Sequence, residues 1–161
     1  MENRFLTSVW QFDSKGTQID DVAKKYKPSD RWGKVVGTSL VFYDQESQDC
    51  LFWLSCEGHG GLVMISDNGK YTNSREYKKA EGSFKVSISK NREIVFFEED
   101  CDYSLLYNML TDEQKEIAEQ HRLKQHEDME KLTNNYTEYK PLSYYAQKTI
   151  ERYYPSITTN F

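Results

Sequence analysis

The chain has 161 residues, of which 37% are hydrophobic and 14% are aromatic. This length is enough to bury a substantial core without disulfides or a metal, so we expect a single domain spanning residues 1–161. The formal net charge of -5 argues against a broad basic surface for duplex DNA or RNA, because binding phosphates requires clustered Lys and Arg. An acidic, tyrosine-rich surface would instead suit a basic, nucleic-acid-binding partner.

The cysteines indicate the cellular compartment. Cys50, Cys56 and Cys101 are odd in number and have no C-x-x-C spacing, which fits neither a secreted disulfide framework nor a cysteine zinc site. The first residues contain no apolar signal region, and no segment approaches the ~18 apolar residues of a membrane span. We therefore expect a protein of the reducing cytoplasm that makes no contact with a membrane.

The N-terminal part of the chain predicts one strand followed by a polar connection. Residues 5–12, FLTSVWQF, favour a strand, although a short helix has the same apolar content. Residues 13–33 contain Gly16, Pro28 and Gly33 and read as a connection with one helical turn at 20–26.

The middle of the chain predicts a sheet of consecutive strands. Residues 34–43 and the segment CLFWLSC at 50–56 flank a polar turn, which predicts a hairpin. A third strand at 62–66 is followed by Asn68-Gly69, a pair that supplies the positive φ angles of a turn.

Two further strands are predicted after a polar stretch at 70–82. The segment FKVSIS at 84–89 alternates, so that Phe84, Val86 and Ile88 share one face. This alternation is typical of a sheet with one side in solvent. The apolar run REIVFF at 92–97 follows it.

Helical signals dominate the rest of the chain. Residues 103–110 follow a group of carboxylates suited to a helix N-terminus. Thr111 to Gln114 form a capping-box pattern that starts a helix running to about residue 132, with Ile117, His121 and Leu132 along a weakly apolar face. Pro141 opens a last helix at 142–154. We therefore predict an α+β fold, in which an antiparallel sheet of about five strands at 31–107 is followed by C-terminal helices at 111–154.

The segment Ser55-Cys56-Glu57-Gly58-His59-Gly60-Gly61 is the most unusual part of the sequence. Glycines around a histidine between two strands suggest that the backbone closely approaches another group. His59 could act as a general base, a metal ligand or a phosphate contact. Alternatively, the glycines serve a tight turn and His59 caps or packs against it.

A second candidate is the run of carboxylates Glu98, Glu99, Asp100 and Asp102 at a strand-to-helix junction. From this position they could hold a divalent cation or a basic group of a partner. Catalysis would require one carboxyl group to be removed from water while another stays charged. The simpler alternative is that they face solvent near a helix N-terminus, where the dipole favours negative charge.

Other residues give weaker signals. Cys56 precedes His59 closely enough to suggest a thiolate pair, although a cysteine at a strand end is more often a small buried hydrophobe. His121 and His126 lack the i, i+4 spacing of a helical zinc pair. Trp32 could stack on a base, but core packing explains it as well. A weak nucleic-acid patch could form from the only basic concentration, which consists of Lys78, Lys79, Lys85, Lys90 and Arg92.

Three short blocks in order resemble an uncharacterised family of phage and plasmid proteins. The blocks are Arg31-Trp32-Gly33-Lys34-Val35, then Cys56-Glu57-Gly58-His59-Gly60-Gly61-Leu62, then Phe97-Glu98-Glu99-Asp100-Cys101-Asp102-Tyr103. The resemblance covers roughly residues 31–107. It implies that His59 and the Glu98 to Asp102 cluster belong to one site.

The resemblance also implies a role in mobile elements. Small acidic proteins of such elements frequently act against host defence, so we expect an anti-defence inhibitor, similar to an anti-CRISPR protein, that binds a host nuclease or nucleoprotein complex. Its binding surface would include the residues Glu98, Asp100, Asp102, Trp32, Gly60 and Gly61. The alternative is a small metal-dependent nuclease or hydrolase in which His59 and Glu99 are catalytic and a divalent metal is the cofactor. A third hypothesis is an oligomeric structural or regulatory module without a site.

Overall fold

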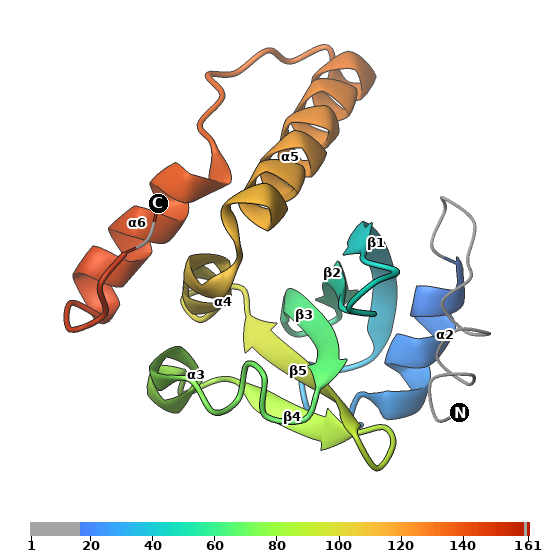
Figure 1. Ribbon diagram of the computed structural model, residues 1–161. Helices are drawn as coiled ribbons and strands as arrows, with labels where there is room; N and C mark the ends of the chain where they lie inside the picture. Colours follow the sequence, from blue (N-terminus) through green and yellow to red (C-terminus); the bar gives the residue numbers. More distant parts are fainter. Residues whose placement is uncertain (1–16, 160) are drawn as a thin grey trace.

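The computed structural model describes residues 17–159 and 161. Its centre is a five-stranded antiparallel sheet with the order β1-β2-β3-β5-β4 (Figure 1). The strands are β1 (Val35–Tyr43), β2 (Cys50–Cys56), β3 (Gly60–Asp67), β4 (Phe84–Ser87) and β5 (Arg92–Glu98). The predicted α+β class and the predicted strands of residues 34–97 are confirmed. The strand expected at 5–12 lies outside the described residues.

Local hydrogen bonds explain why the chain turns between these strands. After β1, the carboxylate of Asp44 accepts from the backbone N–H of Glu46 at 2.9 Å, which closes the polar turn before β2. After β3, Gly69 adopts a φ of +82°, as the Asn-Gly pair predicted. The backbone N–H of Gly69 donates to the buried carboxylate of Glu93 at 3.1 Å and so fixes this turn to β5.

Both faces are covered at the centre of the sheet. The predicted alternation with one solvent-exposed side is confirmed only in the edge strand β4, where Phe84 is buried and Lys85 and Ser87 are exposed. Along β5, Ile94 and Phe96 join one buried cluster, whereas Val95 and Phe97 join the other. Helix α2 (Thr17–Tyr26) covers the first face through Ile19, and the C-terminal helices cover the second. A strand that is buried on both faces needs no polar alternation, which accounts for the continuous apolar run REIVFF.

Two helical segments differ from their predictions. Helix α2 extends over ten residues instead of one turn, because Ile19, Val22 and Ala23 form an apolar stripe that packs against the sheet. The short helix α3 (Arg75–Lys79) was not predicted, since the surrounding sequence is polar. Its N-cap is Ser74, whose hydroxyl accepts from the backbone N–H of Tyr77 at 3.0 Å.

The C-terminal helices are α4 (Tyr103–Met109), α5 (Asp112–Thr133) and α6 (Leu142–Tyr153). The capping box at Thr111 and Gln114 is present, and α5 ends at Thr133, so its predicted start and its predicted end near residue 132 are confirmed. Asn134 follows in the left-handed conformation. In Figure 1, α5 extends away from the sheet and a long connection leads back to α6. Accordingly, Leu132 is 82% exposed, and the predicted apolar face of α5 does not reach this residue.

Among the described residues, no helix is both long enough and apolar enough to cross a membrane.

Candidate functional site

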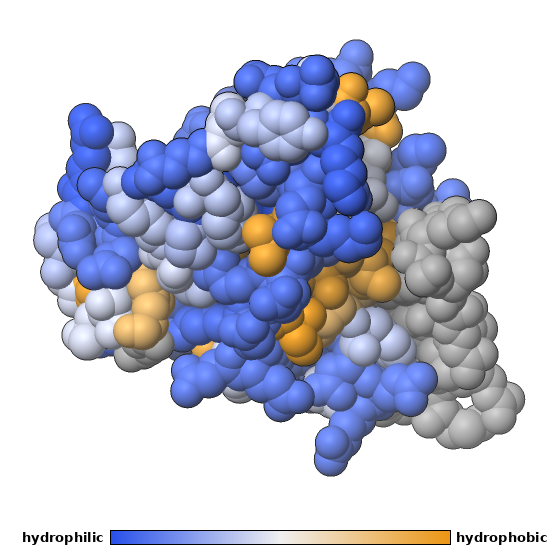
Figure 2. All heavy atoms as spheres, turned by 90° about the horizontal axis from the view of Figure 1, so that it is seen from above, coloured by the Kyte–Doolittle hydropathy of each residue, from blue (hydrophilic) through white to orange (hydrophobic). Residues whose placement is uncertain are grey.

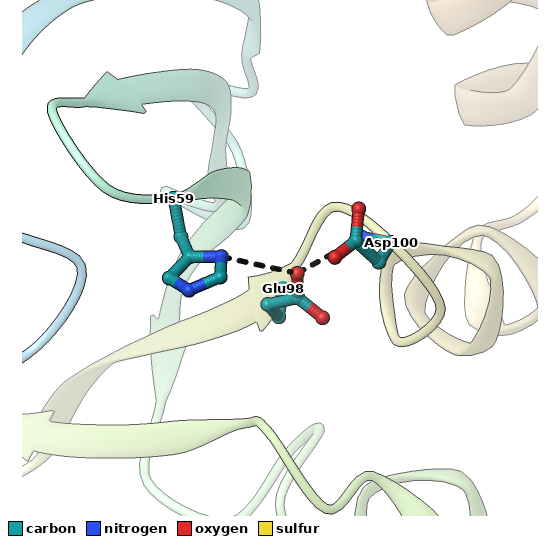
Figure 3. Close-up of side chains that lie close together, drawn as sticks. All are labelled: His59, Glu98 and Asp100. Atoms are coloured by element: carbon teal, nitrogen blue, oxygen red, sulfur yellow. Dashed lines mark hydrogen bonds and ion pairs between the residues drawn. The ribbon is translucent and has the colours of Figure 1, made fainter.

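The pairing of β3 with β5 brings the two strongest sequence candidates together. His59 lies directly before β3, and Gly61 is the register partner of Glu98 at the end of β5. Nδ1 of His59 is 3.8 Å from Oε1 of Glu98. One potential ligand atom from each of His59, Glu98 and Asp100 lies within 4.8 Å of the other two (Figure 3). We call these three residues the His59 cluster.

The His59 cluster combines one sheltered and two accessible groups. The Glu98 side chain is 17% exposed, whereas that of His59 is 58% exposed and Asp100 also faces solvent. Oε1 of Glu98 accepts from the backbone N–H of Asp100 at 3.1 Å, which sets the orientation of its carboxylate. Partial burial raises the pKa of Glu98, and the neighbouring carboxylates of Asp100 and Asp102 raise it further.

Backbone hydrogen bonds from Trp32 hold the loop that carries His59. The carbonyl oxygen of Trp32 accepts from the N–H groups of Gly58 at 2.9 Å and of His59 at 3.2 Å. Trp32 itself has a φ of +62° and is buried, with its ring packed edge-on against Phe84 and Phe96. Trp32 therefore positions the loop through its backbone carbonyl group. Its indole is buried and is not available to a ligand at the surface.

The glycines after His59 allow the strands to approach each other. A Cβ atom on Gly61 would lie 2.0 Å from the carbonyl oxygen of Phe97, and one on Gly60 would lie 2.5 Å from that of Leu54. The predicted close approach is thus between β3 and its own neighbours. Gly60 and Gly61 let the neighbouring strands approach, which places His59 beside Glu98. They have no side chain that could contact a ligand.

Asp102 differs from the other carboxylates, because it is buried and fully engaged. It accepts hydrogen bonds from the backbone N–H of Gly82 at 2.8 Å and from Oγ of Ser83 at 3.1 Å. The phenol of Tyr154, just beyond α6, also donates to it, and burial together with this carboxylate raises the pKa of Tyr154. Asp102 therefore joins the end of α6 to the segment that leads into β4.

Glu99 extends into a different environment from its neighbours in the chain. Its backbone N–H donates to the carbonyl oxygen of Gly60 at 2.9 Å, and its side chain lines a small pocket with Trp53 and Arg122. No sequence pattern pointed to Arg122, since it lies in the middle of a highly charged helix. The pocket depends on how α5 packs against the sheet, which periodicity does not reveal.

The contacts of the remaining candidate residues indicate structural roles. Burial raises the pKa of the Cys56 thiol, and the carboxylate of Glu99 raises it further, which disfavours a thiolate nucleophile. Nε2 of His121 is 2.9 Å from Oγ of Ser39, so this histidine joins α5 to β1. Arg92 is buried and pairs with Asp67 at 2.8 Å, which removes it from the predicted basic patch.

No protein-family model, curated protein or solved structure matches this chain. The assignment of chemistry therefore rests on the geometry of the described residues.

The His59 cluster has the composition of a divalent-cation site. One imidazole nitrogen and two carboxylate oxygens suit Zn²⁺ or Mn²⁺ better than Mg²⁺, which prefers an all-oxygen shell. Two ligands at about 2.1 Å from a tetrahedral ion lie about 3.4 Å apart. The His59 to Glu98 separation of 3.8 Å is close to this value, and the exposed side chains of His59 and Asp100 have room to adjust.

Proposed function

We propose that the protein is a small metal-dependent nuclease or related hydrolase whose cation is held by His59, Glu98 and Asp100. The observation that carries this proposal is the convergence of these three residues. His59 comes from the loop before β3, and Glu98 and Asp100 come from the end of β5 and the turn after it. Three protein ligands leave coordination positions for water and substrate, which is the arrangement of catalytic zinc sites.

The chemistry follows from the ligand set. A divalent cation held by these residues would lower the pKa of a coordinated water toward neutrality and would stabilise negative charge on a phosphate oxygen. The cation also explains how an acidic protein could accept a polyanionic substrate, because it supplies positive charge where Glu98 and Asp100 would otherwise repel phosphate. His59 and Asp100 are accessible from solvent, as a site for a large substrate requires.

The test measures metal binding and cleavage separately. Calorimetric titration with Mn²⁺ and Zn²⁺ is expected to give one site per chain, and single-stranded RNA or DNA should be cleaved only in the presence of the cation. His59→Ala and Asp100→Asn should each weaken binding at least about tenfold, as expected for loss of a direct ligand. Glu127→Gln is the matched control, because Glu127 is an exposed carboxylate on α5, outside the cluster. Equal binding by all these variants would refute the proposal.

A second candidate function is the anti-defence inhibitor that the sequence resemblance implies. The supporting observation is the surface of α5, which carries seven acidic and four basic residues and projects from the sheet (Figure 1). Near its end, Met129 and Leu132 are 58% and 82% exposed, and Tyr136 beyond it is 69% exposed. An acidic surface with a few apolar anchors suits a basic, nucleic-acid-binding host effector in the cytoplasm.

Exposed apolar surface is limited on the face of the molecule that is seen from above (Figure 2). Seen from above, most of the surface is hydrophilic, and hydrophobic residues gather in small patches between the polar areas (Figure 2). Proteins that bind transiently often present such limited apolar patches within a charged surface. The inhibitor would therefore recognise its partner chiefly by charge, with the exposed residues of α5 as anchors.

The two functions are separable by experiment. An inhibitor should form a stable complex with a host nuclease and stop its cleavage at a stoichiometric ratio, and the complex should weaken as the salt concentration rises. Glu127→Lys with Asp128→Lys should impair the inhibitor but leave metal-dependent cleavage unchanged. His59→Ala should have the opposite effect. Absence of any complex with nucleases, over a range of salt concentrations, would eliminate the inhibitor.

A further inference from the structure

A pocket of about 250 Å³ lies next to the strand end that carries the His59 cluster. It is formed where β2 and the end of β5 meet the three C-terminal helices. The lining residues are Trp53, Glu99, Tyr103, Arg122, Leu142 and Tyr145. Pockets for drug-sized ligands are usually ≈300–1,000 Å³, so this one is suited to a smaller group, of the size of a single ring system.

The walls of the pocket are largely aromatic. Tyr103 and Leu142 are buried and form its base, and the rings of Trp53 and Tyr103 lie 6.1 Å apart at 46° to each other. Tyr145 is 41% exposed and stands at the rim. Aromatic faces of this kind favour a flat, apolar ring, because stacking buries both of its surfaces without requiring a fixed in-plane orientation.

Two opposite charges line the pocket without pairing to each other. Within the described part of the chain, the Glu99 carboxylate makes no hydrogen bond or ion pair, although Arg122 lines the same pocket. Arg122 donates through Nε to the carbonyl oxygen of Lys140 at 3.3 Å, and its guanidinium lies 5.2 Å from the ring centroid of Tyr145. For residues 17–159, no hydrogen bond from its terminal nitrogens is found.

An acceptor and a donor thus remain available on the edge of an aromatic pocket. A ligand that satisfies both must have flat apolar faces, N–H groups for Glu99 and an oxygen or ring nitrogen for Arg122. Guanine has this combination, since it carries an exocyclic amino group and the O6 and N7 acceptors that arginine contacts as a bidentate pair. Adenine also has an amino group and N7, but it lacks O6 and so gives arginine a single acceptor on this edge. On the corresponding edge, cytosine presents only an amino donor and uracil only one acceptor.

We propose that this pocket binds a guanine base, with Glu99 accepting from its N–H groups and Arg122 donating to its acceptor edge. Stacking on Trp53 and Tyr145 contributes most of the affinity, and the two charged groups determine which base is preferred. The inference rests on the proposed nuclease and names the base that it would prefer, since Glu99 lies between Glu98 and Asp100 in the chain. Binding itself requires no metal and no turnover.

The test is calorimetric titration of the full chain with GMP, AMP, CMP and UMP in the presence of a chelator. We expect GMP to bind at least about tenfold more tightly than the other three nucleotides, in line with the discrimination of one bidentate contact. Glu99→Gln and Arg122→Met should each weaken GMP binding by about tenfold or more, while Glu127→Gln should not change it. Thermal unfolding of each variant identifies any loss that is due to misfolding.

Several outcomes would overturn the guanine pocket. These are similar affinity for all four nucleotides, no detectable binding of GMP, or binding of a zwitterionic amino acid such as phenylalanine in its place. The result is independent of the hydrolase, because the chelator removes any cation. Loss of cleavage with intact GMP binding would refute the proposed reaction alone, whereas metal binding and cleavage without base preference would refute the pocket alone.

Discussion

A Cβ atom on Gly61 would lie only 2.0 Å from the carbonyl oxygen of Phe97. The oxygen belongs to the backbone of β5 and cannot rotate away, so the strands must separate if residue 61 has a side chain. We expect Gly61→Ala to lower the free energy of unfolding by about 3 kcal/mol or more, because it overpacks a rigid contact at the centre of the sheet. Urea unfolding followed by circular dichroism measures this change.

The chain provides a matched control for that substitution. Gly37 also lies in a strand, but a Cβ atom built there meets no atom within 4 Å. Gly37→Ala should therefore change the free energy of unfolding by less than about 0.5 kcal/mol. If the two variants are equally stable, the β3–β5 seam is not as tightly packed as described.

A second prediction concerns the contribution of Asp102 to the stability of the fold. Asp102→Ala removes the acceptor of three donors, from Gly82, Ser83 and Tyr154, and leaves them without a partner in a buried position. We expect a loss of about 3 kcal/mol in the free energy of unfolding. Asp100→Ala, which removes an exposed carboxylate, should cost less than about 0.5 kcal/mol. Similar losses in the two variants would contradict the structural role of Asp102.

A third prediction concerns the pH dependence of cation binding. The pKa of Glu98 is raised by burial and by the adjacent carboxylates, so protons compete with a cation for this residue at a higher pH than for an ordinary glutamate. The affinity for Mn²⁺ should therefore fall as the pH is lowered, and the fall should begin above the ordinary glutamate pKa of 4.5. Glu98→Gln should weaken binding and flatten this profile. An affinity that stays constant as the pH is lowered would show that Glu98 is not a ligand.

A fourth prediction concerns stability and His121. Burial lowers the pKa of this histidine, and its Nδ1 is buried without a partner in the described residues. Because the unfolded chain takes up a proton near 6.5 and the folded protein only at lower pH, this contribution to stability is complete above 6.5. It declines as the pH falls below that value and is lost below the folded pKa.

The measurement for His121 is the free energy of unfolding of the native protein and of His121→Gln at several pH values. The glutamine retains a hydrogen-bonding group for Ser39 but does not titrate. The stability difference between the two proteins should therefore shrink or reverse as the pH is lowered. A difference that does not vary with pH would mean that the imidazole is not held in its neutral form.

The sequence predicted the sheet well because its turns have specific local chemistry. Asn68-Gly69 and the polar run after β1 end strands for reasons that depend only on neighbouring residues. The capping box of Thr111 is equally local. By contrast, the burial of both faces and the length of α2 depend on which elements pack together, and this information is not contained in a short window of sequence.

In the candidate site too, some residues could be predicted from the sequence and others could not. The sequence motifs singled out His59 and the carboxylates from Glu98 to Asp102, and the β3–β5 register brings His59 close to two of them, Glu98 and Asp100. Glu99, which was expected to be catalytic with His59, lines the separate pocket instead. Their chemical roles were less accessible. Asp102 and Trp32 were expected at a binding surface, yet both are buried. Arg122 was missed, since its place beside Glu99 arises from helix packing far along the chain.

The order of the strands has a consequence for how the molecule folds. Every neighbouring pair except β3–β5 joins strands that follow each other in the chain. A three-stranded meander and a separate hairpin can therefore form early, because short loops cost less entropy to close. His59 belongs to the meander, whereas Glu98 belongs to the hairpin. Until the two units join, His59 and Glu98 lie on separate units, so the His59 cluster forms only when the sheet is complete.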